Sequence, residues 1–374
     1  LEFRRVLFRS GTPTTQNGTF MMTTISIRSA FEGMGSAADG YRSASFERFC
    51  DALDLFRTRV QAQYEGVRYP AGTSMHGAVF NVANGYVDQY GSDVMIPAFL
   101  NTYTAMGGSS LNIFPTLARL LPNWNLRYSG LGKLPWFREH FKSVNINHGY
   151  KSIYAVGAYA SYNTFVEYMD GLGFISDVTT GNPLPRSMFN VANVSINEAF
   201  SPLLGVDATF NNNLTAKVEY RSTRVLNLSM TSVQINEAVS RDWVAGMSYR
   251  INNFKFFGLT TSRAKKSKNK RSDANTNASE NNSRGNTNHD LNMRLDLSYR
   301  QQASISRDIA SRTSTASSGN KAFKMSFSAD YTLSRLLTMS FYYDRQTNTP
   351  LLSSNSYPTT TQDFGLSLKF SLTR

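Results

Sequence analysis

The stretch Leu291–Tyr299 (LNMRLDLSY) decides the fold of this chain, because its apolar and polar residues alternate without a break. Leucine, methionine and tyrosine hold every second position, and asparagine, arginine, aspartate and serine fill the positions between them. Successive side chains of a β-strand point to opposite faces, so this period of two predicts a strand with one apolar and one polar face.

The same alternation recurs in Leu214–Tyr220, Phe323–Tyr331 and Phe364–Leu372. Over the four windows, all 19 positions of one face are apolar or Tyr, and all 15 positions of the other are polar or Gly. The period predicts an antiparallel all-β region over 122–374 with about eleven strands. The expected strands are Pro122–Ser129, Lys142–Ser161, Phe189–Phe210, Leu214–Thr231, Asp242–Arg250, Phe254–Thr261, Asp290–Tyr299, Ala303–Ala310, Lys321–Tyr331, Leu336–Asp344 and Thr361–Thr373.

Strand length and composition both favour a membrane wall over a soluble sandwich. Lys142–Ser161, Phe189–Phe210 and Leu214–Thr231 hold 18 to 22 residues each, whereas a tilted membrane strand needs about 9 to 11 and a soluble strand averages about 5 or 6. Only 17% of the 374 residues are charged, against about 25% in soluble proteins. No apolar run reaches the roughly 18 residues of a transmembrane helix. We therefore expect a transmembrane β-barrel segment.

The links between the expected strands alternate in length. Short links fall at Asn211–Asn213, Ile251–Asn253, Arg300–Gln302 and Thr332–Arg335, and longer polar links at Ser232–Arg241, Ser262–His289, Ser311–Gly319 and Gln346–Thr360. In bacterial outer-membrane barrels the short turns face the periplasm and the longer loops face outward. The alternation predicts an outer-membrane location with the C-terminus in the periplasm.

The two faces of the expected wall carry different candidate residues. Tyr prefers the headgroup level of a bilayer, where its ring is buried and its hydroxyl is wet. The candidate aromatic girdle is Tyr220, Tyr249, Tyr299, Tyr331 and Tyr343. Charges of both signs on the other face suit a wide, non-selective conduit. The candidate lumen-facing residues are Lys217, Glu219, Asp242, Arg250, Arg294, Asp296, Lys324, Asp330 and Lys369.

The first third of the chain differs in texture. Leu1–Ser10 (LEFRRVLFRS) is typical of adapter or vector sequence and is left out of the fold argument. Residues 11–43 are rich in Thr, Ser and Gly and are expected to be loose and extended. Residues 44–121 are expected to form a helical or irregular region in the lumen or the periplasm. Apolar residues recur at three- and four-residue steps in Phe46–Tyr64, which predicts a helix, and Asp93–Thr104 is a second candidate, interrupted by Pro97.

No catalytic, metal or cofactor site is expected. The single cysteine, Cys50, excludes a disulfide framework, and the four histidines show no ligand spacing. The sequence has no G-x-S-x-G motif and no P-loop. The formal net charge is +13, but six cations fall within Arg263–Arg271 beside an Asn/Ser-rich stretch. That concentration indicates a solvated loop rather than a nucleic-acid-binding face.

Eight segments resemble the SprA/Sov family, the giant outer-membrane proteins of type IX secretion in Bacteroidetes. The resemblance covers roughly residues 85–374, and the Lys/Asn-rich insert Arg263–His289 departs from it. The matching stretches are Asp93–Leu100 (DVMIPAFL), Leu121–Leu131 (LPNWNLRYSGL), Lys133–Phe137 (KLPWF), Val144–Tyr159 (VNINHGYKSIYAVGAY), Val194–Ala208 (VSINEAFSPLLGVDA), Leu214–Leu228 (LTAKVEYRSTRVLNL), Phe327–Arg335 (FSADYTLSR) and Phe364–Arg374 (FGLSLKFSLTR).

The resemblance implies a C-terminal piece of a single very large barrel. It implies a passive translocon that passes folded cargo bearing a C-terminal signal domain, and in some members a link to gliding motility. The implied partners are outer-membrane lipids, secreted cargo, a small porin-like barrel, a plug protein and periplasmic prolyl-isomerase-type proteins. A piece with two open edges would not be stable in lipid, because unpaired backbone groups there cost several kcal/mol each.

Three other interpretations stay open. The first is another outer-membrane barrel, such as a nutrient receptor with Ala44–Leu121 as its plug. The second is an outer-membrane protease or lipase, and the third is a soluble β-rich adhesin. Many more strands upstream would favour the translocon, whereas a compact plug and a closed strand count would favour the receptor.

Overall fold

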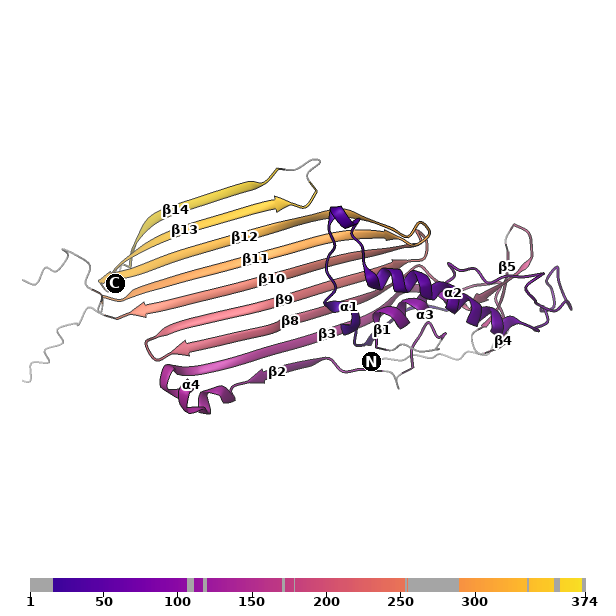
Figure 1. Cartoon of the computed structure of the whole chain (residues 1–374), viewed down its shortest axis with the longest axis horizontal. Helices are drawn as coiled ribbons and strands as arrows, with labels where there is room; N and C mark the ends of the chain where they lie inside the picture. The colour runs from indigo at the N-terminus through magenta and orange to yellow at the C-terminus, as the bar shows by residue number, and fades with distance from the viewer. Residues whose placement is uncertain are drawn as a thin grey trace, which may run out of the picture.

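The computed structural model describes residues 16–105, 111–116, 120–169, 172–177, 179–252, 254, 289–334, 336–352 and 357–371. They form one large antiparallel sheet, a small three-stranded sheet and a helical region near the N-terminus (Figure 1). The mostly β architecture expected from the alternation is therefore confirmed. The helices are α1 (Ile27–Ala30), α2 (Ala44–Tyr64), α3 (Ser92–Tyr103) and α4 (Pro135–His140), with short 3-10 helices η1 (Ala37–Asp39) and η3 (Gly130–Lys133).

The large sheet runs in the order β1-β3-β8-β9-β10-β11-β12-β13-β14, and β2 and β7 also pair with β3. From β8 to β14 each strand pairs with the next one in the chain, so its long strands lie side by side (Figure 1). The strands of this sheet are β1 (Asn17–Thr23), β2 (Trp124–Tyr128), β3 (Phe141–Ser161), β7 (Phe189–Val191), β8 (Asn193–Phe210), β9 (Leu214–Ser229), β10 (Gln234–Ile251), β11 (Leu291–Asp308), β12 (Thr313–Ser334), β13 (Leu337–Pro350) and β14 (Thr359–Phe370).

Several predicted strand limits are wrong. Asp290–Tyr299 and Ala303–Ala310 are one continuous strand, β11, because every residue of Arg300–Gln302 pairs with both β10 and β12. Strand β10 begins at Gln234 rather than Asp242, and β12 begins at Thr313 rather than Lys321. The stretch added to β12 (TSTASSGN) has no apolar face, and in the stretch added to β10 Glu237 and Arg241 share a face with Ile235 and Val239, so the alternation is interrupted in both. The predicted strand Phe254–Thr261 lies outside the described residues except for Phe254, which is not in a strand.

The predicted alternation of short and long links is also wrong. Strands β9 and β10 are joined by residues 230–233 and β11 and β12 by 309–312, so both links are short. The long insertion between Ile251 and Leu291 emerges at the same edge of the sheet as the short links 211–213 and 335–336. Strand β14 ends at that edge too, since Phe370 pairs with Leu337. We call it the C-terminal edge.

The helical region packs against one face of the sheet at the end away from the C-terminal edge (Figure 1). Both predicted helices are present, as α2 and α3, and the second continues through Pro97, its sixth residue. Residues 11–43 were expected to be loose, but β1 pairs with the second half of β3 and places Phe20 and Met22 against the core. No helix among the described residues is long and apolar enough to cross a membrane.

A small sheet of β4 (Val166–Met169), β5 (Leu172–Ser176) and β6 (Pro183–Ser187) supports the helical region and was not predicted. The hydroxyl of Tyr64 in α2 donates to the carbonyl of Gly173 in β5 at 2.9 Å. Phe174 is buried against Tyr64, with ring centroids 5.3 Å apart. We call residues 24–105 the cover, because they shield one part of the sheet from solvent.

Candidate functional site

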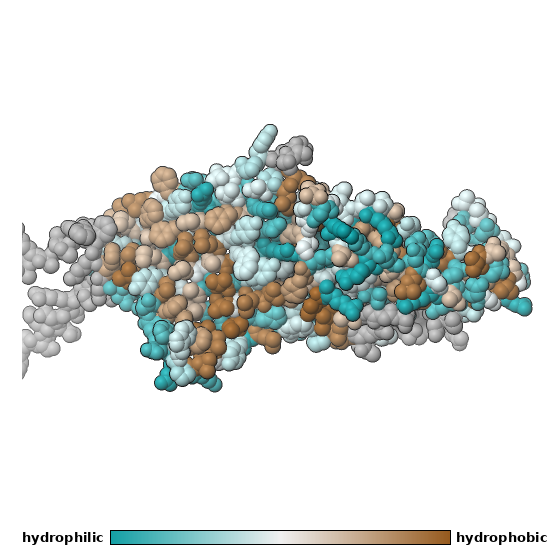
Figure 2. Space-filling view, viewed as in Figure 1, coloured by the Kyte–Doolittle hydropathy of each residue, from teal (hydrophilic) through white to brown (hydrophobic). Residues whose placement is uncertain are grey.

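Near the C-terminal edge, strands β10 to β14 have one strongly apolar face. The register places Trp243 opposite Tyr299 and Tyr299 opposite Phe323, and the same face continues through Phe341 and Leu366. Large side chains on it are exposed, among them Trp243 at 54% and Leu366 at 64%. Figure 2 shows hydrophobic residues gathered over this end of the sheet and hydrophilic ones over the helices. We call this surface the belt.

All five tyrosines of the predicted girdle lie on the belt face, but not at one level. Tyr220, Trp243, Tyr299 and Phe323 form a row of directly opposed aromatic residues on four neighbouring strands, at the belt's inner boundary. Two others, Tyr249 and Tyr331, lie near the C-terminal edge. Tyr343 is opposite Phe327 in the middle of the belt, so its predicted place at a boundary is wrong.

The opposite face of the same strands is polar, and the register places all nine predicted lumen-facing residues on it. The register rows that carry them are Asp207–Lys217–Gly246–Asp296, Glu219–Val244–Ser298–Lys324, Arg221–Asp242–Arg300, Thr215–Ser248–Arg294, Arg250–Asn292–Asp330 and Thr338–Lys369. We call this surface the polar face.

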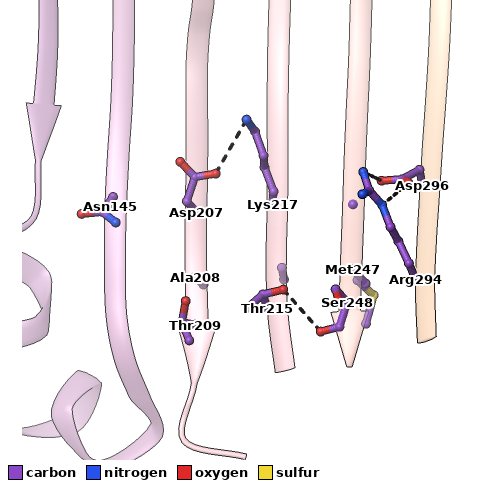
Figure 3. Close-up of a pocket in the computed structure, with 12 residues that line it drawn as sticks. Asn145, Asp207, Ala208, Thr209, Thr215, Lys217, Met247, Ser248, Arg294 and Asp296 are labelled. Atoms are coloured by element: carbon purple, nitrogen blue, oxygen red, sulfur yellow. Dashed lines mark hydrogen bonds and ion pairs between the residues drawn. The ribbon is translucent and has the colours of Figure 1, made fainter. Parts of the chain in front are cut away.

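Most charges of the polar face are paired with an opposite charge, and Lys324 and Lys369 are the two predicted cations that take part in no ion pair among the described residues. The ammonium of Lys217 lies 2.6 Å from the Glu219 carboxylate and 4.0 Å from that of Asp207 on the neighbouring strand. Arg294 pairs with Asp296 at 2.6 Å (Figure 3). Further ion pairs join Arg221 to Glu219, Arg300 to Asp242 at 2.8 Å, and Arg250 to Asp290 at 2.5 Å.

A shallow open hollow of about 340 Å³ lies on this face between β3 and β11 (Figure 3). Gly246 forms its floor, where a side chain would meet the carboxylate of Asp296. Asp207 and Lys217 point toward one another on one side, and Arg294 and Asp296 do so on the other (Figure 3). Such paired, hydrated charges offer no free ion to hold a ligand. Among the described residues, no group of three or more His, Cys, Asp or Glu could hold a metal ion.

Sequence reasoning missed the charges that hold the cover in place. Glu237 and Arg307 are 6% and 1% exposed. Their side chains are on the same side of the sheet as the belt, but further from the C-terminal edge, in the part that the cover buries. The Glu237 carboxylate accepts from Arg224 Nε at 2.7 Å and from Arg307 Nε at 2.8 Å. The sequence did contain a signal for these residues. Arg224, Glu237 and Arg307 occupy positions on the face that otherwise carries the apolar side chains of their strands.

Each buried arginine also reaches the cover directly. Arg224 Nη1 donates to the carbonyl of Ser29 at 2.6 Å, and Arg307 Nη1 donates to that of Tyr41 at 2.6 Å. The Arg307 guanidinium lies 5.8 Å from the ring centroid of Phe46 in α2. Arginine suits this role because its several donors satisfy a carboxylate and a carbonyl at once. The cover is therefore fixed to the wall by a buried hydrogen-bonded ion cluster.

A second buried charge lies inside the cover. Asp93 at the start of α3 is 3% exposed, and within the described chain neither of its carboxylate oxygens has a hydrogen-bond partner. Burial raises the pKa of Asp93 to about 6, although the guanidinium of Arg186 opposes the rise. Arg186 is itself paired with Asp88 at 2.6 Å. The Asp93 carboxylate therefore destabilises the cover wherever it is ionised.

No protein-family model matches the chain, and no curated protein matches it.

Proposed function

We propose that this chain forms part of the wall of an outer-membrane β-barrel that conducts secreted proteins. The belt carries the proposal: its exposed aromatic and aliphatic side chains extend from Trp243 on β10 to Phe370 on β14. Soluble monomers rarely expose contiguous apolar patches larger than a few hundred Å². The opposite face of the same strands is charged and polar, as in a barrel whose outside faces lipid and whose inside faces water.

The height of the belt supports the proposal. From Trp243 to Ile251 the strand advances by eight residues, roughly 27 Å at about 3.4 Å per residue. With a strand tilt of about 35–45°, this distance gives a belt roughly 19–22 Å tall. Outer-membrane barrels have an apolar band about 25 Å tall with aromatic residues at both boundaries. The row from Tyr220 to Phe323 supplies one boundary and Tyr249 lies at the other, whereas Tyr331 at that second boundary is buried against Phe254 and His289.

The position of the belt also supports the orientation. It lies next to the C-terminal edge, where the links 211–213 and 335–336 are short, whereas the other half of each strand extends beyond it. Link length does not decide between the two edges, because the links 230–233 and 309–312 at the other edge are short too. Outer-membrane barrels, however, extend further beyond the bilayer on the outer side than on the periplasmic side. We therefore still propose that the C-terminal edge lies in the periplasm. The reason is now the position of the belt along the strands and not an alternation of link lengths. The insertion 252–290 then begins and ends on the periplasmic side.

The open edge of β14 requires further strands. Phe364 and Leu366 on this strand are 76% and 64% exposed, and β14 pairs only with β13 in the described sheet. Unpaired backbone groups in hydrocarbon cost several kcal/mol each, so such an edge must be paired by another strand in the membrane. The sheet is thus one arc of a larger barrel.

The role in type IX secretion rests on the resemblance to the SprA/Sov family. A wide lumen suits folded cargo, and the self-paired charges of the polar face suit passage without retention, because a neutralised lining offers no strong site to a passing protein. The porin-like barrel, the plug protein and the prolyl-isomerase-type proteins remain proposed partners on the same ground.

The position of the cover argues against a plugged receptor. A plug occupies the lumen, which the polar face with Lys217 and Asp296 would line. Helix α2 packs on the other side of the sheet, on the belt face. Under this proposal the cover lies outside the barrel and beyond the belt on the side away from the periplasm. The sequence had led us to expect residues 44–121 in the lumen or the periplasm. Under this proposal the cover lies in neither place.

Depletion of the full-length protein in a bacterium that makes it tests the proposal. We expect cargo with the C-terminal signal domain to accumulate in the periplasm, while an unrelated outer-membrane barrel still inserts normally. The protein itself should remain in the outer-membrane fraction after an alkaline wash. Unchanged secretion would refute the translocon role but leave the wall intact, and recovery in the soluble fraction would refute the wall.

A further inference from the structure

A short segment at the C-terminal edge is held rigidly against the wall. It contains η3 and α4 and leads into β3. The backbone N–H of Asn211 donates to the carbonyl of His140 at 3.2 Å, and its side-chain amide donates to that of Glu139 at 2.6 Å. The ammonium of Lys142 donates to Asn213 Oδ1 at 2.8 Å. The segment is therefore fixed to the turn between β8 and β9.

Aromatic rings connect this segment to the belt. Phe210 follows Ala208 by two residues and so lies on the belt face, and its ring centroid is 4.5 Å from that of Phe141. Phe137 lies 5.8 Å from Phe141. Trp136 stacks on His140 at 5.0 Å and is 61% exposed. The indole thus lies exposed beside the boundary of the belt that faces the C-terminal edge.

The same segment is basic. Between residues 127 and 142 it contains four cations and one anion, which gives 4 − 1 = +3 with histidine neutral. All five side chains are exposed, and the cations are Arg127, Lys133, Arg138 and Lys142, with Glu139 the anion. Beside the aromatic cluster is an open hollow of about 470 Å³ lined by Trp136, His140 and Phe210.

We infer that residues 127–142 are an interfacial anchor that binds the headgroup phosphates of anionic phospholipids. Exposed tryptophan prefers the headgroup level of a bilayer, and each Lys or Arg near an anionic membrane surface increases binding by a factor of roughly five. The anchor is continuous with the belt and has the charge that complements phosphate. This inference rests on the proposed membrane wall.

Photo-crosslinking in nanodiscs tests the anchor. The full-length protein is placed in phosphatidylcholine bilayers with or without phosphatidylglycerol, each doped with one of two diazirine lipids. One probe is a phosphatidylglycerol with its diazirine on the headgroup, and the other carries it in the acyl chain. Mass spectrometry of the crosslinked peptides should show the headgroup probe on residues 127–142 and the acyl probe on belt peptides containing Trp243 or Leu366.

The variant Lys133→Gln/Arg138→Gln/Lys142→Gln should lower headgroup crosslinking at residues 127–142 by about tenfold or more, since each cation contributes a factor of roughly five. Raising the salt from 0.05 M to 0.5 M should lower it as well. The matched control Arg28→Gln/Arg57→Gln/Arg68→Gln removes the same charge from exposed positions of the cover and should change nothing.

The outcomes separate the two ideas. Labelling of the belt by the acyl probe without headgroup labelling of residues 127–142 would overturn the anchor and leave the wall standing. Headgroup labelling that is equal for the control and the triple variant would also overturn it, because the phosphate charge would then play no part. Failure of the acyl probe to label the belt would refute the proposed wall itself.

Discussion

The belt and the area under the cover are two halves of the same face of the same strands, yet they are built in opposite ways. The belt exposes Trp243 and Leu366, whereas the covered half buries Glu237 and Arg307. A single strand, β10, passes from one half to the other without a break in its pairing. Backbone alternation therefore fixes which side chains share a face, and the surroundings of each half decide what chemistry that face carries.

The largest effect should come from the covered half. Glu237→Ala leaves Arg224 and Arg307 buried without their shared carboxylate, and breaking a buried ion pair costs about 3–5 kcal/mol. We expect the cover to detach at lower denaturant concentration, read as earlier proteolysis within α2 of the full-length protein in detergent. Asn236→Ala, on the other face of β10, is the control. Equal behaviour of the two variants would show that the ion cluster does not hold the cover.

The belt should respond to charge more strongly than the polar face. Met247→Arg places a cation in the middle of the belt and should destabilise the folded protein in lipid by about 2–4 kcal/mol. Ser326→Arg, one register row away on the polar face, lies between Asp296 and Asp344 and should be tolerated. Urea unfolding in lipid vesicles measures both. Similar destabilisation by the two arginines would break the distinction between the faces.

A third test concerns the cover's own buried charge. The pKa of Asp93 is raised by burial to about 6 from 3.8, so the folded state binds more protons than the unfolded state between these values. Stability of the cover must therefore fall as the pH rises from about 4 to about 6 and remain lower above it. Asp93→Asn should stabilise the cover by roughly 3 kcal/mol at pH 7 and flatten this fall. Proteolysis of α2 in denaturant at several pH values measures it, and an unchanged pH profile would assign the fall to another group.

The smallest effect is expected on the polar face. Arg294→Ala removes the partner of Asp296, but the arginine side chain is 68% exposed, and exposed ion pairs contribute little to stability. Thermal unfolding in detergent should not change measurably. A clear loss of stability would mean that the polar face is packed against something rather than hydrated.

The sequence predicts the fold well where one face is apolar. The windows Leu291–Tyr299 and Phe323–Tyr331 lie in strands β11 and β12, and the window that begins at Phe364 lies in β14 as far as Phe370. Their faces agree with the register. The prediction weakens where both faces are polar, as in the first residues of β12, because neighbouring strands rather than side-chain pattern extend the pairing there. Arg224, Glu237 and Arg307 lie on three separate strands, so the alternation within each strand marks a charge at an apolar position but does not show that the three charges meet.

The central claim is that the two faces of the wall meet lipid and water, and a scan along Leu291–Tyr299 tests it most directly. Single cysteines would carry spin labels in the full-length protein in nanodiscs, in a Cys50→Ser background. Cys50 itself is buried, and burial raises the pKa of its thiol to about 11. We expect labels at Met293, Leu295 and Leu297 to collide with dissolved oxygen and those at Asn292, Arg294 and Asp296 with a water-soluble nickel complex. Equal exposure of both sets to the nickel complex would contradict the account.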